Sequence, residues 1–187
     1  MNRRELLKMV ALATGGVVIG GEFLLTGCKN AASDKGFALS AEQIDLLDEV
    51  AETILPTTKT PGAKAAKVGE FMQVMVKDCY ELKDQQIFLE GITKLEEACK
   101  KVNGKSFMEC TAEERTKLLQ QLDTERKEYQ SKKKGEEPNH YFQMMKQLTL
   151  TGYFTSEIGA TQALRHVAVP GKYDGCMPYQ KGDKAWA

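Results

Sequence analysis

The segment SAEQIDLLDEVAETILP, residues 40–56, contains the start, body and end signals of one amphipathic helix. Ser40 and Gln43 form a helix capping box, in which the serine oxygen accepts a hydrogen bond from the backbone N–H of the third helical residue. Pro56 ends the helix, because the residue before a proline is pushed out of the helical region. Between these limits apolar residues recur at helical spacing; they are Ile44, Leu47, Val50, Ala51, Ile54 and Leu55.

The same signals recur further along the chain. Thr111 and Glu114 form a second capping box, and Asn103-Gly104 ends the helix that precedes it. The helix that leads up to Cys79 is apolar on more than one face, so we expect it in the middle of the core. Helices are predicted from about 61 to 79, over 84–102, from 111 to about 122, over 140–150, and, as a short element, from about 156.

No segment shows the convincing alternation of a β-strand, so the sequence predicts an all-α fold. We expect a single helix-bundle domain of five or six helices over residues 40–187. From about residue 167 the chain is rich in proline, glycine and aromatic residues without periodicity. This composition predicts an irregular, extended C-terminal tail that lies on its own domain or on a partner.

Two groups of charged residues are interpreted as solvated surface. Residues 123–139 are dense in charge and poor in apolar side chains, which predicts a solvated helix end followed by a mobile loop. Carboxylates at helical spacing usually form a face in contact with water. Those of the first helix are Asp45, Asp48, Glu49 and Glu52.

The composition excludes one class of partner. The chain has 187 residues, with 26 Lys and Arg against 26 Asp and Glu, and an isoelectric point near 6.7. Proteins that bind nucleic acid usually have a basic excess. We therefore expect no nucleic-acid partner.

The N-terminus resembles an export signal. Arg3 and Arg4 lie in Asn-Arg-Arg-Glu-Leu-Leu-Lys, which is similar to the twin-arginine consensus Ser/Thr-Arg-Arg-x-Phe-Leu-Lys. The weakly apolar stretch that follows is shorter than the roughly 20 residues of a membrane-spanning helix and contains an acid, Glu22. Residues 1–27 are therefore predicted to be a cleaved signal peptide of the twin-arginine type.

Cys28 follows Leu-Thr-Gly, which resembles the lipobox of bacterial lipoproteins. In such signals the cysteine receives a diacylglycerol group and becomes the first mature residue. We expect an exported bacterial lipoprotein, anchored to a membrane on its periplasmic side, with residues 28–39 as a flexible tether. The alternative is a buried or free cysteine beside a transmembrane helix.

Four other cysteines remain if Cys28 is acylated. An even number in an exported protein permits disulfides, and four cysteines allow three pairings. Free, buried thiols are the alternative, and the sequence does not choose between them. The four are Cys79, Cys99, Cys110 and Cys176.

The sequence offers no catalytic, cofactor-binding or metal-binding constellation. His140 and His166 have no partner at metal-ligand spacing, and both are expected to be structural or exposed. No glycine-rich dinucleotide fingerprint follows a strand. The sequence thus predicts no catalytic residue, no bound cofactor and no metal site in this chain.

An ordered set of short motifs resembles the gluconate 2-dehydrogenase subunit 3 family over about residues 40–178. The motifs are Ala51-Glu-Thr-Ile-Leu-Pro56, Thr60-Pro-Gly-Ala63, Leu148-Thr-Leu-Thr-Gly-Tyr-Phe-Thr-Ser-Glu-Ile-Gly159 and Pro170-Gly-Lys-Tyr-Asp-Gly-Cys176, behind a twin-arginine signal. The resemblance implies the accessory small subunit of a membrane-associated sugar or polyol dehydrogenase, not an enzyme by itself. It implies a separate large subunit of the FAD-dependent GMC type, with a cytochrome c as a candidate electron acceptor.

On this resemblance, the chain binds the flavoprotein, escorts it through twin-arginine export and tethers it to the membrane. Aromatic residues are enriched in interface cores, so the candidate partner interface consists of Tyr153, Phe154, Tyr173, Tyr179 and Trp186. These aromatics could instead fold back on their own helices. The alternative function is that of a stand-alone, lipid-anchored periplasmic binding protein, which would need a concave pocket.

Overall fold

The computed structural model describes residues 37–187 except 136, 170 and 173. This part of the chain is helical, as predicted, and its only β-type pairing is an isolated bridge between Arg165 and Trp186. It forms one compact unit, Phe37–Ala187. The elements, in chain order, are the α-helices α2 (Ala41–Ile54), α3 (Val68–Cys79) and α4 (Leu82–Asn103), the 3₁₀ turn η1 (Phe107–Glu109), the α-helices α5 (Ala112–Lys132) and α6 (Tyr141–Thr155), and the π-helical turn η2 (Gly159–Ala163).

The two capping boxes that the sequence predicts are confirmed. Ser40 accepts from the Gln43 backbone N–H, and the Gln43 side chain accepts from the Ser40 N–H at 2.9 Å. Thr111 and Glu114 make the same pair of bonds at the start of α5. Gly104 ends α4 in the left-handed region, at φ 72°, where a residue without Cβ is favoured.

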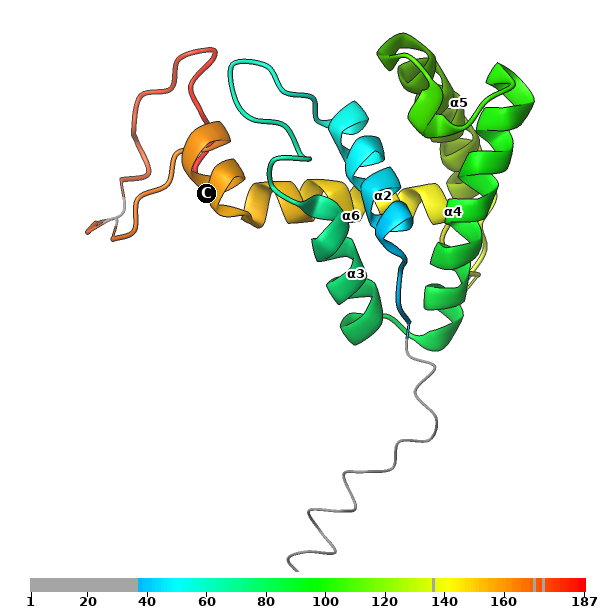
Figure 1. The fold of residues 1–187 in the computed structure, drawn as a ribbon. Helices are drawn as coiled ribbons and strands as arrows, with labels where there is room; N and C mark the ends of the chain where they lie inside the picture. The colour runs from blue at the N-terminus through cyan, green and yellow to red at the C-terminus, as the bar shows by residue number, and fades with distance from the viewer. Residues whose placement is uncertain (1–36, 136, 170, 173) are drawn as a thin grey trace, which may run out of the picture. The chain divides into compact units, whose positions relative to one another are not determined.

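Helix α6 lies at the centre of the bundle. It packs against α2, α3, α4 and α5, and Figure 1 shows it running across the other helices. Its buried residues fall on more than one side of the helix; they are Phe142, Met144, Met145, Leu148, Thr149, Gly152 and Tyr153. The prediction that the helix ending at Cys79 occupies the middle of the core is wrong: α3 buries one stripe and leaves Val74 54% exposed.

The second helix starts later than predicted. The sequence indicated a start near Pro61, but residues from Ala63 to Lys67 form turns closed by hydrogen bonds from Ala66 N to Ala63 O and from Lys67 N to Lys64 O. Lys67 then adopts the left-handed conformation, at φ 53°, directly before α3 begins at Val68. The connection from Pro56 to Lys67 is therefore a loop of bends and turns, held in part by these local hydrogen bonds.

Two helices extend beyond their predicted ends. Helix α5 continues to Lys132, so the first part of the charged segment 123–139 is a solvated helix end, as predicted. Asp123 there contacts Arg126, Lys127 and Lys146, and these cations hold its pKa far below the ordinary value against the opposing effect of burial. Helix α6 continues past residue 150 to Thr155.

The compact unit begins before residue 40. Phe37 and Leu39, which the sequence assigns to the flexible tether, are buried. The ring of Phe37 packs at 6.2 Å from that of Phe88 in α4, and the Leu39 N–H donates to the Gln73 side chain. Residues 1–27 of the predicted signal peptide lie outside the described residues. No helix of the described part has both the length and the apolar character that crossing a bilayer requires.

Candidate partner interface

The C-terminal end of α6 is fixed by the loop that precedes α3. Tyr153 is buried, and its hydroxyl donates a 2.7 Å hydrogen bond to the carbonyl of Pro61. Gly152 lets α3 approach closely, because a Cβ at this position would lie 2.6 Å from the ring of Phe71. Residues of two separate motifs, around positions 60–63 and 148–159, therefore meet in one junction.

The chain turns sharply after α6. The backbone N–H and the hydroxyl of Ser156 both donate to the Tyr153 carbonyl, at 3.1 and 2.6 Å, and the Gly159 N–H donates to the Ser156 hydroxyl at 3.0 Å. A Cβ on Gly159 would lie 1.8 Å from the same carbonyl oxygen, so only glycine fits without a backbone shift. This turn sets the direction in which η2 and the tail leave α6.

The loop between α2 and α3 is held by a carboxylate of α2. One oxygen of Glu52 accepts from the backbone N–H and the hydroxyl of Thr57, both at 2.7 Å, and the other accepts from the Lys64 backbone N–H at 3.0 Å. The Leu55 carbonyl accepts from the Ala63 N–H at 3.0 Å, which closes the same loop. Glu52 thus positions the segment that supports Tyr153.

Neighbouring carboxylates of α2 also make tertiary contacts. Glu49 pairs with Arg115 of α5 and with Lys64 at 2.7 Å. Burial raises the pKa of Glu49, but the hydrogen bond from Lys64 and the charge of Arg115 outweigh it and hold the pKa below its ordinary value of 4.5. Asp48 accepts from the Gly69 N–H at 2.7 Å, and burial raises its pKa. The interpretation of this stripe as a water-facing surface is therefore wrong for Asp48, Glu49 and Glu52.

The C-terminal tail is closed into a loop. Arg165 N–H donates to the Ala185 carbonyl at 2.8 Å, and Ala187 N–H donates to the Arg165 carbonyl at 3.1 Å. The Arg165 guanidinium lies 4.8 Å from the ring centroid of Trp186, in cation–π geometry. Figure 1 shows this loop leaving the C-terminal end of α6 and returning to it.

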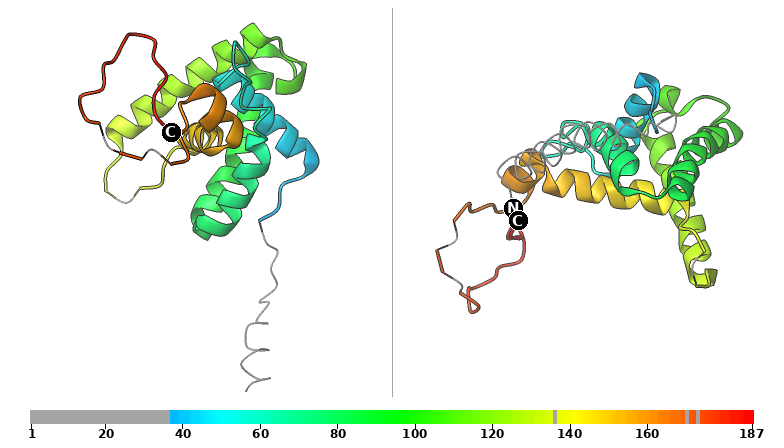
Figure 2. Two further views of the ribbon diagram at one scale, coloured as in Figure 1. Left: turned by 90° about the vertical axis from the view of Figure 1, so that its left-hand side faces the viewer. Right: turned by 90° about the horizontal axis from the view of Figure 1, so that it is seen from below.

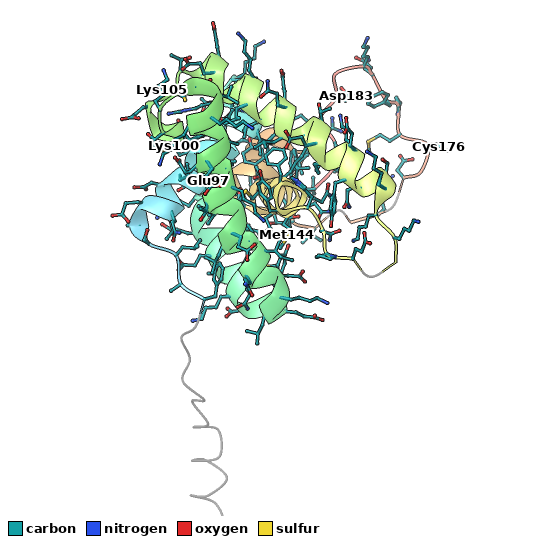
Figure 3. All side chains as sticks on the ribbon, turned by 90° about the vertical axis from the view of Figure 1, so that its right-hand side faces the viewer. Glu97, Lys100, Lys105, Met144, Cys176 and Asp183 are labelled. Atoms are coloured by element: carbon teal, nitrogen blue, oxygen red, sulfur yellow. The ribbon has the colours of Figure 1, made fainter. Side chains whose placement is uncertain are left out.

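Every described residue from 166 to 187 is exposed. The right-hand view of Figure 2 shows the loop extending away from the helices, and Figure 3 shows Cys176 and Asp183 on it. We define the tail surface as the exposed large apolar residues of this loop and of the adjoining end of α6. Each of these residues is between 37% and 82% exposed; they are Leu150, Phe154, Val167, Val169, Met177, Tyr179 and Trp186.

The predicted interface residues are placed as follows. Tyr153 is 4% exposed and offers no ring surface to a partner. Phe154, Tyr179 and Trp186 are exposed and belong to the tail surface. Tyr173 lies outside the described residues.

Leu150 is a residue of the tail surface that its sequence pattern does not reveal. Leu150 lies one helical turn before Phe154, at a spacing of four residues, so the two share a face of α6. Helical spacing alone did not separate this exposed pair from the buried residues around it. The predicted export and lipidation residues Arg3, Arg4 and Cys28 also lie outside the described residues.

His140 caps a helix, and His166 lies at the surface. His140 is the N-cap of α6: its Nδ1 accepts from the Phe142 N–H at 3.2 Å, its ring stacks on Tyr141, and burial lowers its pKa. His166 is exposed. Among the residues that the structure describes, no three His, Cys, Asp or Glu side chains gather as metal ligands would.

Two grooves of similar volume lie on the helical bundle. One, of about 480 Å³, lies between α2, α5 and α6. The other, of about 460 Å³, lies between α4, α5 and the start of α6. Charged and aliphatic side chains line it, among them Glu97, Lys101 and Leu118, and Tyr141 is its one aromatic residue. Trp186 lies instead beside Arg165 on the tail, so the groove and the exposed aromatics do not form one site.

The sequence model of gluconate 2-dehydrogenase subunit 3 matches residues 41–171, which span every helix of the described residues and the first part of the tail. No curated protein and no solved structure gave a match.

Proposed function

This chain belongs to the gluconate 2-dehydrogenase subunit 3 family, and we propose that it is the non-catalytic small subunit that binds, escorts and tethers an FAD-dependent dehydrogenase large subunit. The family is one of accessory subunits of dehydrogenase complexes. In the proposed complex the large subunit is of the GMC type, binds the FAD and oxidises a sugar or polyol hydroxyl. The small subunit binds no cofactor itself.

The observation that supports this proposal is the tail surface. A monomeric protein usually buries its large apolar side chains, and several of them left exposed on one segment mark a candidate contact site. Here Phe154, Tyr179 and Trp186 are exposed together with four aliphatic or thioether residues on one loop and the helix end beside it. Aromatic residues are also enriched at the centres of protein interfaces. The large subunit is the partner that would cover this surface.

Export and tethering are proposed from the N-terminal sequence. Arg3 and Arg4 match the arginine pair of a twin-arginine signal, and Cys28 follows a lipobox-like tripeptide. The twin-arginine route transports folded proteins, which suits a cargo that takes up its flavin before export. Acylation at Cys28 would anchor the complex on the periplasmic side, because several acyl chains hold a protein at a bilayer better than one. A cytochrome c is the proposed electron acceptor.

The first experiment tests the complex. The full chain, with an affinity tag after Ala187, is expressed in its native host and purified from membranes in mild detergent. We expect a flavoprotein in equal amount, with the absorption spectrum of bound FAD and with sugar- or polyol-dependent reduction of an artificial acceptor. The chain purified alone from membranes, with no flavin in any fraction, would favour a stand-alone binding protein and refute the proposal.

The second experiment separates docking from export and anchoring. Tyr179→Ala with Trp186→Ala should reduce the amount of co-purified flavoprotein, whereas Val74→Ala, on the exposed side of α3, should not. Arg3→Lys with Arg4→Lys should leave both subunits in the cytoplasm. Cys28→Ser should abolish lipidation and release the complex from the membrane. If the flavoprotein still reaches the periplasm with the double lysine variant, the escort role is wrong.

A further inference from the structure

Two of the four unassigned cysteines lie next to each other in the core. Cys99 is in the last turns of α4, and Cys110 directly follows η1, yet their Sγ atoms are 3.3 Å apart. Cys99 is fully buried and Cys110 is 5% exposed. Lys100 and Lys105, labelled in Figure 3, mark the path of the chain between them. Cys79 and Cys176, in contrast, are exposed.

The connection that brings the two sulfurs together is defined on both sides. Gly104 caps α4, and Ser106 forms a capping box with Glu109 around η1. Arg115 of α5 donates from Nε to the Phe107 carbonyl at 3.0 Å and from a terminal nitrogen to the Met108 carbonyl at 2.8 Å. The short distance between the two sulfurs therefore follows from a turn that these hydrogen bonds hold in place.

The environment of the sulfur pair contains one polar group. The side-chain nitrogen of Asn103 donates towards both sulfurs, at 3.7 Å to Cys99 and 3.4 Å to Cys110. Phe107, which is fully buried, lies between the two cysteines in the sequence. No other described side chain makes a hydrogen bond to either sulfur, so the two cysteines interact chiefly with each other.

We infer that Cys99 and Cys110 form an intramolecular disulfide in the exported protein. A disulfide has an S–S length of about 2.05 Å, so the two sulfurs need to approach by about 1.3 Å from their present separation. The bond would join the end of α4 to the start of α5 across the Gly104 turn. Cys99 and Cys110 are the cysteines whose sulfurs are in contact, and the exposed Cys79 and Cys176 remain thiols.

The step is an oxidation by thiol–disulfide exchange. The two S–H bonds break, one S–S bond forms and two protons leave. Two electrons pass to the disulfide of an oxidising thiol–disulfide oxidoreductase, which becomes a dithiol. The oxidant belongs to an oxidising compartment, so in the cell this inference rests on the export step of the proposed function.

Burial affects the rate at which the bond forms. Burial raises the pKa of the Cys99 thiol to about 11, and the hydrogen bond with Cys110 adds to this. Because the thiolate is the attacking species, the folded dithiol should react slowly, and the α4–α5 connection must open briefly for exchange. The same burial would protect the finished disulfide from external thiols.

The first test is a peptide map of the full chain purified from membranes. Free thiols are blocked with N-ethylmaleimide in denaturant without reductant, and the protein is digested with trypsin. We expect peptide Leu95–Lys100 joined to peptide Ser106–Arg115, and N-ethylmaleimide on the peptides that contain Cys79 and Cys176. N-ethylmaleimide on both Cys99 and Cys110, or a cross-link of another pairing, would overturn the inference.

The second test does not depend on export. The Arg3→Lys, Arg4→Lys chain, retained in the cytoplasm and purified with its thiols reduced, is incubated with oxidised glutathione. We expect the same joined peptides to form slowly, and their absence after incubation continued until no further thiol is lost would overturn the inference. A failure of export seen in the variants above would instead bear only on the proposed function.

A matched pair of variants then measures the contribution of the bond. The disulfide would close the loop from Cys99 to Cys110 and so reduce the entropy of the unfolded chain. Breaking it with reductant should therefore lower the melting temperature by about 5–10 °C. Cys79→Ser should keep the joined peptides and this response to reductant, since Cys79 is exposed. Cys99→Ser should lose both. A response to reductant that persists in Cys99→Ser would contradict the assignment.

Discussion

Replacing Glu52 by Gln tests whether this carboxylate organises the loop between α2 and α3. The two oxygens of Glu52 accept three hydrogen bonds, two from Thr57 and one from the Lys64 backbone N–H. Gln has the same shape but only one acceptor oxygen. If that oxygen keeps the Thr57 bonds, the amide NH₂ faces the Lys64 N–H, and two donors oppose each other.

The expected loss follows from these contacts. One hydrogen bond to a charged acceptor disappears, which costs about 1.5–3 kcal/mol when the site is buried. The two remaining bonds weaken, because bonds to a charged group are roughly twice as strong as neutral ones. The site is partly exposed, so solvent reduces these values, and we expect a loss of about 2 kcal/mol. For a protein of this size that corresponds to a decrease in melting temperature of about 4–8 °C.

The assay is thermal unfolding followed by far-UV circular dichroism, together with amide hydrogen exchange. The Thr57 and Lys64 amides should exchange faster in Glu52→Gln, whereas amides in the middle of α6 should change only through the global loss of stability. Glu70→Gln is the matched control, since Glu70 pairs only with Lys67 on an exposed face. If Glu52→Gln and Glu70→Gln melt at the same temperature, Glu52 does not organise the loop.

Three further predictions concern the core, the ion pairs and the tail. Met145→Ala should lower the free energy of unfolding by about 2–5 kcal/mol in urea denaturation because Met145 is fully buried, whereas Val74→Ala should stay within about 0.5 kcal/mol; equal losses would contradict the central position of α6. The pKa of Glu49 is lowered by folding, so its stabilisation is complete above the ordinary value of 4.5 and is lost as the pH falls through the folded-state pKa. The difference in stability between wild type and Glu49→Gln should therefore shrink from about pH 6 to about pH 3, and a constant difference would refute this. Trp186 is the single tryptophan, so Arg165→Ala, which removes its cation–π partner, should lower the fluorescence anisotropy of the tail; an unchanged anisotropy would show that this contact does not hold it.

Local signals in the sequence predicted the starts of α2 and α5 and the end of α4 well. The capping boxes at Ser40 and Thr111 and the glycine stop at Gly104 depend on residues close together in the chain. Their chemistry is complete within one turn of helix, so tertiary structure adds little to it. Helix existence and class were therefore predictable from pattern alone.

The arrangement of the helices was less predictable. Apolar residues on several faces suggested a central α3, but α6 is central, and Val74 shows that part of the apolar surface of α3 stays exposed. Periodicity describes which residues share a face, not which face meets another helix. In the same way, the spacing of Asp48, Glu49 and Glu52 does not reveal that the donors they face come from Gly69, Lys64 and Thr57.

The candidate interface was predictable only in part. Aromatic content pointed to residues of the tail, and Trp186 and Tyr179 are indeed exposed. Tyr153 is also aromatic, but it is buried. Its hydroxyl donates to the carbonyl of Pro61, which is 92 positions away in the chain. A contact over such a separation has no trace in local sequence.

The closure of the tail by Arg165 affects the free-energy cost of binding a partner. A free segment must lose about 1–2 kcal/mol of conformational entropy per residue when its backbone becomes fixed. This segment is held at both ends, by Arg165 at its start and by Ala185 and Ala187 at its finish, so part of that loss is already incurred in the unbound protein. A large subunit would therefore bind a preorganised loop. Loss of the hydrogen bonds between Arg165 and the C-terminal residues should weaken binding of the large subunit, even though no side chain that contacts it has been removed.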